Sequence, residues 1–427
     1  MLGGGTFVNQ NKVLPGSYIN FVSAKNAAAT MGERGYAALA LPLSWGIDGA
    51  IFTVTSEDFR SYCKKLFGFA YDSDEAKGLR DLFRNIQTLY CYKLMKNGVQ
   101  ASNDIAKAKY KGVAGNTIST EILTGTMSGT YDVNIYFGND IVYSANVKTL
   151  GELKATDNGF VEWTLSELAA TEKSTMTGGS NGDTVTATEH SAFLDAAESY
   201  SFNAMGCMSE DTAIQTLYIQ EVKDMRNNKG LHYQVVLYGN AADHETVVNV
   251  KNCKDAVYWT LGVIAGCPVN QSNTNRVYDG EFDIPTNYTQ AQLESAIKSG
   301  EFAFHRVGLE TRVLCDINSL VTTTPDKGED FKANQTIRVI DQIAMDIAGI
   351  FNTKYIGKIP NNKSGRVSLW NDIVSHHQQL ETIGAIEDFD PAGVVVSAGE
   401  TKRSVVVQDA VTIVNAMEKL YMTVVVA

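Results

Sequence analysis

The chain ends in LYMTVVVA at positions 420–427, an apolar and β-branched run that contains neither a charge nor a proline. Termini are normally polar and frayed, and a bare strand at a terminus tends to pair with another chain. At about 3.3 Å per residue, a strand of this length reaches about 26 Å, enough to lie along the sheet edge of a neighbouring subunit. Near the other end, NKVLPG at 11–16 is a turn signal, and SYINFV at 17–22 has the pattern of a second strand without an obvious partner. The alternative is that each strand closes a sheet within its own domain.

Composition limits the classes of protein to which the chain can belong. It has 427 residues, a net charge of −12, 44% hydrophobic residues and 20% charged residues. These values predict about two to four globular, soluble domains with sizeable cores. An acidic chain is not expected to bind nucleic acid, because nucleic-acid-binding surfaces are basic. No apolar run is long enough to cross a bilayer, and the start lacks a signal peptide's basic and apolar regions, so we expect no membrane insertion.

The six cysteines show no CxxC spacing. We expect them to be reduced and mostly buried thiols of a protein made in the cytosol.

The hydrophobic pattern changes along the chain. It is mixed from about 30 to 100, alternates with period two from about 110 to 175, and alternates between helical and strand patterns from about 185 to 320. The period-two region includes a hairpin with its turn at Gly138–Asp140 and predicts a small β-sandwich insert. The later alternation predicts an α/β layer with a largely parallel sheet.

The last part of the sequence predicts a long helix over 334–352, a helix over 369–383, a strand over 404–407, a short helix and the terminal strand. The resulting division is an N-terminal strand arm over 1–25, the first part of an α/β body over 26–105, a β-sandwich insert over 106–180, an α/β domain over 181–325, a C-terminal domain over 326–415 and a C-terminal strand arm over 416–427.

A search for catalytic chemistry is negative. The glycine-rich TGGSNGD at 177–183 lacks the lysine of a P-loop and the spacing of a dinucleotide fingerprint, so a flexible interdomain turn is the favoured interpretation. No GxSxG elbow occurs, and no histidine carries a local triad signature. The sequence therefore predicts no catalytic residue, no cofactor and no enzyme.

Two clusters of titratable residues resemble metal ligands only superficially. His376 and His377 are adjacent, so on a helix they point about 100° apart and cannot chelate one ion together; a solvated pair is favoured. Glu387, Asp388 and Asp390 lack the 12-residue calcium loop, which favours an exposed acidic loop. We predict no metal site.

Four stretches, taken in their order along the chain, resemble the tail sheath proteins of contractile phage tails and of the related defective prophages and R-type bacteriocins. They are the opening segment 3–21, with GGGTF followed by QNKVLPGSYINF; GGSNG at 178–182; LGVIAGCPVNQS at 261–272; and 334–368, which contains IRVID and YIGK. The resemblance covers nearly the whole chain and is weakest in the β insert.

The resemblance implies a fold and a function. In that family the central α/β domain is subtilisin-like in topology but has no protease activity, and it carries an inserted β-sandwich and a C-terminal, tube-proximal α/β domain. Terminal arms add strands to the sheets of neighbours, which is β-augmentation. The implied partners are further copies in a helical homopolymer, the inner tail tube protein, and baseplate and tail terminator proteins. Assembly in the bacterial host cytoplasm and a place in a virion tail or a released tail-like particle follow from the same resemblance.

Two competing functions remain open at this stage. One is an α/β hydrolase-like enzyme with a β accessory domain, and the other is a secreted or surface-layer structural protein.

The candidate site residues fall into two groups. The intersubunit strand arms comprise Ser17, Tyr18, Ile19, Asn20, Phe21, Leu420, Tyr421, Met422, Thr423, Val424, Val425 and Val426. A basic segment over 347–371, which has no Asp or Glu, contributes Lys354, Lys358, Lys363 and Arg366. This segment could attach to an acidic patch on the tube protein, or to the Glu387–Asp390 region of a neighbour; an ordinary solvated basic surface is the alternative.

Overall fold

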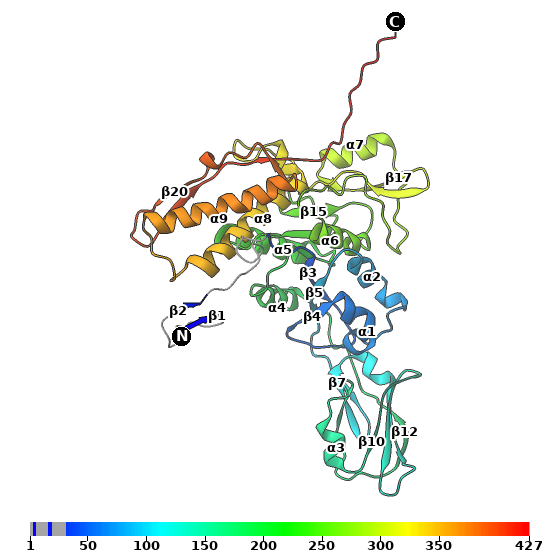
Figure 1. Ribbon diagram of the computed structural model, residues 1–427. Helices are drawn as coiled ribbons and strands as arrows, with labels where there is room; N and C mark the ends of the chain where they lie inside the picture. The colour runs from blue at the N-terminus through cyan, green and yellow to red at the C-terminus, as the bar shows by residue number, and fades with distance from the viewer. Residues whose placement is uncertain (1–2, 6–15, 19–30, 427) are drawn as a thin grey trace. The chain divides into compact units, whose positions relative to one another are not determined.

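The computed structural model describes residues 3–5, 16–18 and 31–426 (Figure 1). The chain forms two compact units. The large unit comprises residues 34–338 and 416–427, and the small unit comprises residues 1–33 and 339–415.

A seven-stranded sheet forms the centre of the large unit, in the order β16-β15-β14-β13-β3-β5-β4. All neighbouring strands are parallel except β4, which runs antiparallel to β5. The largely parallel sheet predicted from the sequence is therefore confirmed. The strands are β3 (Tyr36–Leu41), β4 (Ile51–Thr55), β5 (Thr88–Lys93), β13 (Ala204–Gly206), β14 (Gln234–Tyr238), β15 (Val247–Val250) and β16 (Glu301–Phe302).

Helices cover both faces of this sheet, and the alternation of side chains along β3 shows how. Ala37 and Leu39 belong to one buried cluster, whereas Ala38 and Ala40 belong to another. The first cluster packs against α1 (Ser56–Phe67), α2 (Lys77–Phe83) and α6 (Ala256–Gly266), and the second against α4 (Ala187–Ala197) and α5 (Thr212–Asp224). Strands buried on both faces need continuous apolar sequence, which explains the YAALAL of β3.

The edge of this layer near β16 carries α7 (Gln290–Lys298) and a hairpin of β17 (Phe304–Val307) and β18 (Glu310–Val313). A capping box starts α7, because Thr289 and Gln292 cap each other's backbone N–H groups.

The insert consists of two antiparallel sheets, β10-β9-β8-β12 and β11-β7-β6. The predicted hairpin is β9 with β10, and the two sheets share one buried cluster that includes Ala106, Ile118 and Ile135. The elements are β6 (Gln100–Ser102), β7 (Ala106–Lys111), β8 (Ile118–Thr124), β9 (Tyr131–Phe137), β10 (Asp140–Val147), α3 (Leu150–Ala155), β11 (Val161–Trp163) and β12 (Thr171–Thr175).

The glycine-rich stretch 177–183 is not a free turn, so that expectation is wrong. Ser180 pairs with Val99 and Thr177 pairs with Ser102 in short bridges. Gly182 has a φ of 74° and approaches the carbonyl of Lys96 so closely that a Cβ would lie 1.9 Å from its oxygen. The glycines are needed for this close backbone pairing.

The small unit is built on two long helices, α8 (Asn334–Ile350), followed by a π-helical turn at Phe351–Tyr355, and α9 (Lys363–Thr382). The long helix predicted over 334–352 is confirmed. Helix α9 begins six residues before the predicted start, because the Asn362 side chain accepts a hydrogen bond from the Gly365 N–H at 2.8 Å and caps the helix there.

Two short antiparallel sheets complete the small unit. One pairs β19 (Ile386–Glu387) with β22 (Thr412–Ile413), and the other pairs β20 (Val395–Ala398) with β21 (Val405–Gln408). The strand predicted over 404–407 is confirmed as β21. The short helix predicted after it is wrong, because β22 pairs with β19 at that point.

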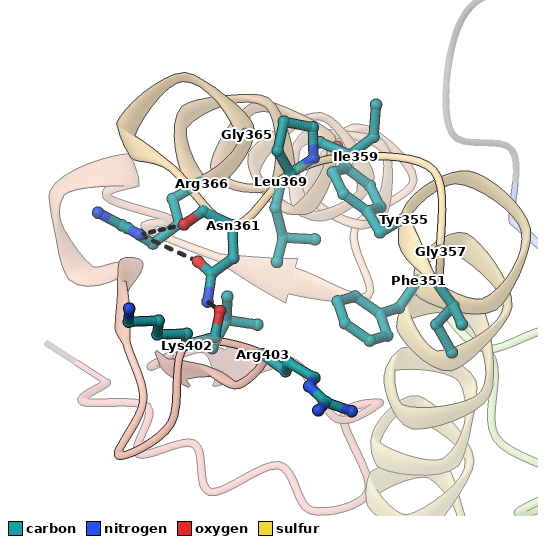
Figure 2. Close-up of a pocket in the computed structure, with 13 residues that line it drawn as sticks. Phe351, Tyr355, Gly357, Ile359, Asn361, Gly365, Arg366, Leu369, Lys402 and Arg403 are labelled. Carbon is teal, nitrogen blue, oxygen red and sulfur yellow. Dashed lines mark hydrogen bonds between the residues drawn. The ribbon is translucent and has the colours of Figure 1, made fainter.

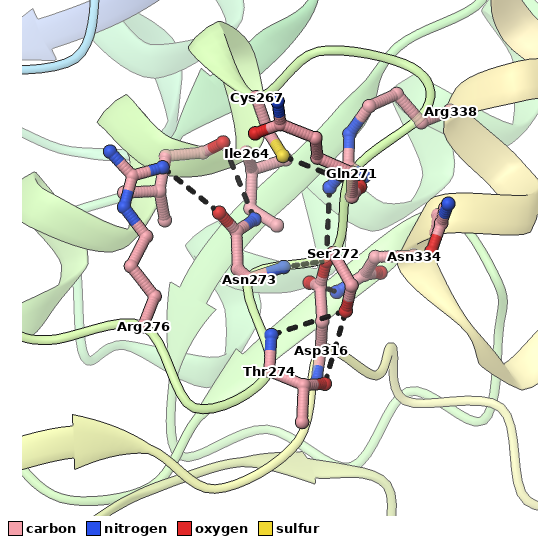
Figure 3. Close-up of polar contacts among 12 residues, drawn as sticks. Ile264, Cys267, Gln271, Ser272, Asn273, Thr274, Arg276, Asp316, Asn334 and Arg338 are labelled. Atoms are coloured by element: carbon pink, nitrogen blue, oxygen red, sulfur yellow. Dashed lines mark hydrogen bonds and ion pairs between the residues drawn. The ribbon is translucent and has the colours of Figure 1, made fainter. Parts of the chain in front are cut away.

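A buried polar network holds the start of α8 within the large unit (Figure 3). Arg338 and Asp316 form an ion pair at 3.1 Å, and each side chain is 1% exposed. The Asp316 carboxylate also accepts hydrogen bonds from the Asn334 side chain and the Asn273 backbone N–H, both at 2.9 Å. Arg338 donates a further hydrogen bond to the Gln271 carbonyl at 2.8 Å. Both buried charges are thus compensated.

We expect Arg338→Ala to lower the free energy of unfolding by about 3–5 kcal/mol, because it leaves the Asp316 carboxylate buried without its counter-charge. Urea denaturation followed by circular dichroism measures this loss. The control is Arg306→Ala, which removes an exposed arginine on β17. Equal stabilities of the two variants would contradict the structural role of the ion pair.

Candidate assembly interface

The β20–β21 hairpin of the small unit has an open structure. Within the described chain, each of its strands has one neighbour, so both outer edges of the sheet lack a partner strand. Val396 and Val405 pack towards the core of the unit, whereas Val395, Val406 and Val407 are 49%, 47% and 38% exposed. An isolated two-stranded sheet is marginally stable, and unpaired edges readily accept another strand.

A cavity of about 420 Å³ opens beside this hairpin (Figure 2). Phe351 and Leu369 contribute apolar walls, and Arg366, Lys402 and Arg403 bring positive charge to its lining. A second, more open cavity shares Arg366 and is also lined by Lys363, Val367, Trp370, Val396, Ser397 and Ala398. The surface beside the hairpin therefore combines apolar and cationic side chains.

Asn361 connects the β20–β21 turn to the start of α9. Its Nδ2 donates to the carbonyls of Ser404 at 2.7 Å and Lys402 at 3.2 Å, and its Oδ1 accepts from Arg366 at 3.0 Å. The backbone can approach closely here because residue 365 is glycine; a Cβ would lie 2.2 Å from the Pro360 carbonyl oxygen. This arrangement places Arg366 and the turn residues Lys402 and Arg403 around one cavity.

The four basic residues predicted from the sequence do not form one cluster. Lys363 and Arg366 line the cavities. Lys354 instead pairs with Asp372 at 3.1 Å, and Lys358 is exposed and donates to the Thr353 carbonyl at 2.6 Å. The window without acidic residues ended at 371, so it missed the carboxylate one position later.

Asp372 also accepts a hydrogen bond from the Tyr355 hydroxyl at 2.7 Å. Burial of the phenol and this hydrogen bond raise the pKa of Tyr355. The hydroxyl therefore stays protonated and holds the carboxylate of Asp372 in place.

Sequence reasoning missed Lys402 and Arg403. The signal was present, because AGETKRS separates the valine-rich stretches VVVS and VVVQ, a pattern typical of a hairpin with a polar turn.

The C-terminal segment is the exposed apolar run of the large unit. Residues 416–418 are attached to that unit: Ala416 N–H donates to Gln335 at 3.0 Å, and Glu418 accepts from Thr274 at 2.7 Å. Residues 419–426 form no helix or strand. Their large apolar side chains are between 68% and 90% exposed, namely Leu420, Tyr421, Met422, Val424, Val425 and Val426.

The N-terminal segment differs from the prediction. Ser17 and Tyr18 lie in β2 (Gly16–Tyr18), which pairs in parallel with β1 (Gly3–Gly5). The expectation that this strand has no partner in its own chain is therefore wrong for these residues, since glycines without side chains can pair without a core to fill. Ile19, Asn20 and Phe21 lie outside the described residues.

The two adjacent histidines are not solvated, and that prediction is wrong. His376 and His377 are both 0% exposed. The His376 ring contacts Asp346, and the His377 ring contacts Asp409. Other parts of the small unit therefore cover both sides of α9 that carry these rings. Among the described residues, no group of three or more His, Cys, Asp or Glu side chains could hold a metal ion.

Comparison with known proteins identifies the family. Residues 183–319 match the phage tail sheath protein central domain, and residues 326–427 match the phage tail sheath C-terminal domain. The phage-like element PBSX protein XkdK of Bacillus subtilis is 30% identical over 99% of both chains. The chain belongs to the phage tail sheath family. The resemblance seen in the sequence is thereby confirmed.

Solved sheath structures share the fold. The sheath tail protein of Desulfitobacterium hafniense is 29% identical, with a TM-score of 0.79 over 95% of this chain and 99% of that one. The sheath tail protein of Listeria innocua is 26% identical, with a TM-score of 0.79 over 93% and 96% of the two chains. The contracted helical sheath of the anti-feeding prophage has a TM-score of 0.56 at 13% identity, over 97% of this chain and 99% of that one, and shows the fold alone.

The protein is thus a structural subunit of a contractile tail sheath, with a mixed α/β multidomain fold, and belongs to a phage tail or tail-like particle. The six cysteines are free and four of them are buried, as expected for reduced thiols. None of the described helices is both long and apolar enough to cross a membrane.

We expect Asn361→Ala to loosen the β20–β21 hairpin, because the turn loses two hydrogen bonds to the start of α9. A hydrogen bond contributes about 0.5–1.5 kcal/mol, so amide exchange over 395–408 should accelerate by about tenfold. Hydrogen–deuterium exchange measures this, with the exposed Asn352→Ala as the control. Unchanged exchange in Asn361→Ala would show that the turn is held by other contacts.

Proposed function

We propose that this sheath subunit polymerises by donating its terminal segments as strands to the β20–β21 sheets of neighbouring copies. The observation that carries the proposal is the presence of two complementary features in the described part of the chain: an apolar segment at 420–426 that pairs with no described strand, and a small sheet whose edges no described strand covers. Backbone hydrogen bonds would satisfy the edge, and alternate side chains would cover the exposed valines.

Burial of the C-terminal segment would supply much of the binding free energy. Fully burying a Val, Leu or Met side chain contributes about 1.5–3 kcal/mol, and six large apolar side chains are exposed in the segment. Ordering the segment costs about 1–2 kcal/mol per residue, so the net gain per strand is modest. A polymer with many such contacts is stable, while each contact remains reversible during assembly.

Exchanged strands would allow the sheath to contract without separating its subunits. Strands anchored in neighbours keep copies connected while the large units rotate and slide around an inner tube. In the extended polymer, the subunits would be metastable until a baseplate releases them. Contraction would bury more surface between copies and drive the tube through a cell envelope. Small gains per subunit add when equivalent contacts repeat along the polymer, so the reaction needs no nucleotide.

The remaining parts of the proposal come from the family resemblance. They are a subtilisin-like topology of the central domain without protease activity, contacts with the tube and tail terminator proteins, and assembly in the bacterial host cytoplasm. The alternative of a hydrolase-like enzyme has less support. The lining of the 420 Å³ cavity contains no Ser, Cys, His, Asp or Glu.

The cationic side chains of the two cavities suggest where an acidic partner would bind. We propose Lys363, Arg366, Lys402 and Arg403 of the cavity linings, together with the exposed Lys358 outside them, as the cationic contact for the tube protein or for the acidic Glu387–Asp390 region of another copy. Lys354 contributes less, because Asp372 already neutralises it. Exposed ion pairs are worth only about 0.2–1 kcal/mol each, so they would set register between repeats and break easily on contraction.

Deletion of residues 420–427 should give a folded protein that does not form tubes, because the donated strand is lost. Circular dichroism checks folding, and negative-stain microscopy with sedimentation checks assembly. A matched pair tests the chemistry of the arm: Val424→Asp/Val426→Asp should also block assembly, whereas Val424→Ile/Val426→Ile should assemble. Normal sheaths from the truncated protein would contradict strand donation by this arm.

The Lys358→Glu/Lys363→Glu variant should weaken the extended polymer, giving premature contraction or loss of tube attachment, most strongly at low salt, where charges are less screened. Electron microscopy of sheaths on tubes at several salt concentrations measures this. The control is Lys107→Glu/Lys298→Glu, the same charge change at two exposed lysines of the large unit. If the two double variants behave alike, the basic surface has no specific contact role.

A further inference from the structure

Four buried or partly buried side chains of the small unit form a continuous hydrogen-bonded chain. His376 Nε2 lies 2.9 Å from Asp346 Oδ2 on α8, and His377 Nε2 lies 2.6 Å from Asp409 Oδ2, one residue beyond β21. The two Nδ1 atoms lie 3.1 Å apart. We call these four residues the histidine relay.

The relay connects the two ends of the small unit's chain. Asp346 Oδ1 accepts a hydrogen bond from the Gly32 N–H at 3.0 Å, and Gln342 donates to both the Gly32 carbonyl and Asp346. Gly32 follows the N-terminal segment, and Asp409 precedes β22 and the C-terminal segment. The segments from which both proposed arms extend are therefore held by the same chain of contacts.

The geometry sets the number of protons. Each of the three contacts, Asp346–His376, His376–His377 and His377–Asp409, needs one hydrogen between its two heavy atoms. Two neutral imidazoles carry only two ring protons, so the relay needs a third. With both carboxylates ionised, one ring is an imidazolium and the other is neutral.

Two carboxylates, Asp346 from α8 and Asp409 from the segment after β21, contact the rings and favour this single added charge. The uncharged ring of Phe389 packs against His377, with the ring centroids 5.2 Å apart. A fourth proton would place two N–H donors and two positive charges against each other at the Nδ1 contact. Loss of the third proton would leave two lone pairs facing there.

We propose that the histidine relay is a proton-binding latch that, in its three-proton state, fixes the two segments of the small unit that lead to the terminal arms, at Gly32 and at Asp409, and loosens them when a fourth proton binds or the third is lost. The latch rests on the proposed function, in which the arms carry assembly. Gain of the fourth proton would therefore loosen both segments together, while residues 416–418 keep their own contacts with Gln335 and Thr274.

The first test is nitrogen-15 NMR of the histidine rings in the full-length monomer, with the rings assigned from the single variants His376→Gln and His377→Gln. The expected result between pH 6 and 8 is one ring protonated at both nitrogens and the other only at Nε2. Two neutral rings, or rings that titrate independently, would overturn the proposal.

The second test asks whether the two segments, at Gly32 and at Asp409, are coupled. Asp409→Asn keeps the shape of the side chain and removes its charge at a position that is 26% exposed, so folding should be retained. Hydrogen–deuterium exchange of the monomer should accelerate by about tenfold over 405–414 and also at Gly32, because a hydrogen bond to a charged group is lost. His305→Gln, on β17, is the control and should leave both regions unchanged.

Acceleration confined to 405–414 would overturn the latch, since a purely local role of Asp409 cannot reach Gly32. Because both tests use the monomer, they are independent of assembly. Failure of strand donation would instead appear in the truncation experiment, with the relay's ring protonation intact.

Discussion

No strand among residues 3–5, 16–18 and 31–426 pairs with either outer edge of the β20–β21 sheet, and these open edges are the constraint on which this account of the sheath subunit depends. A two-stranded sheet presents two rows of backbone N–H and C=O groups and cannot bury a core of its own. Here one face rests on α9 through Val396 and Val405, while Val395, Val406 and Val407 remain exposed. A surface of this kind is poorly suited to an isolated monomer but well suited to a subunit that is completed by its neighbours.

The rest of the small unit supports this hairpin. Asn361 attaches the turn to the start of α9, and the histidine relay attaches the segment after β21 to α9 and α8. The large unit is organised differently, with helices on both faces of a parallel sheet and a buried Arg338–Asp316 pair at the start of α8. The boundary between the two units falls within α8, between Arg338 and Val339.

The spacing of hydrophobic residues predicted an element correctly where one face of that element is buried. The 334–352 helix and the 131–147 hairpin were predictable because their apolar residues repeat with the period of the structure. Residues 17–18 and 177–183 were misjudged because glycine-mediated backbone pairing leaves no side-chain pattern. Strand β20 was missed although its valines resemble those of β21, and its recognition also reveals Lys402 and Arg403.

Polar side chains were the least predictable part of the candidate site. The His376–His377 pair looked solvated because helical geometry separates adjacent side chains, yet both rings find carboxylates from segments distant in sequence. Lys354 was predicted to be available for a contact with another protein because Asp372 lies one residue beyond the segment 347–371, which has no Asp or Glu. Such pairings depend on tertiary contacts, which hydrophobic periodicity does not encode. The C-terminal arm was only partly predictable. The exposure of residues 420–426 was predictable from composition, but the strand that this segment would form needs another copy of the chain.

A cryo-EM reconstruction of the assembled sheath that resolves side chains would test strand donation most directly. The account predicts that residues 420–426 of one copy form a β-strand hydrogen-bonded to the outer edge of β20 or β21 in another copy, and that Val395, Val406 and Val407 become buried. A sheath in which 420–426 stay unpaired, or fold back onto their own chain while β20 and β21 remain a two-stranded sheet, would contradict it.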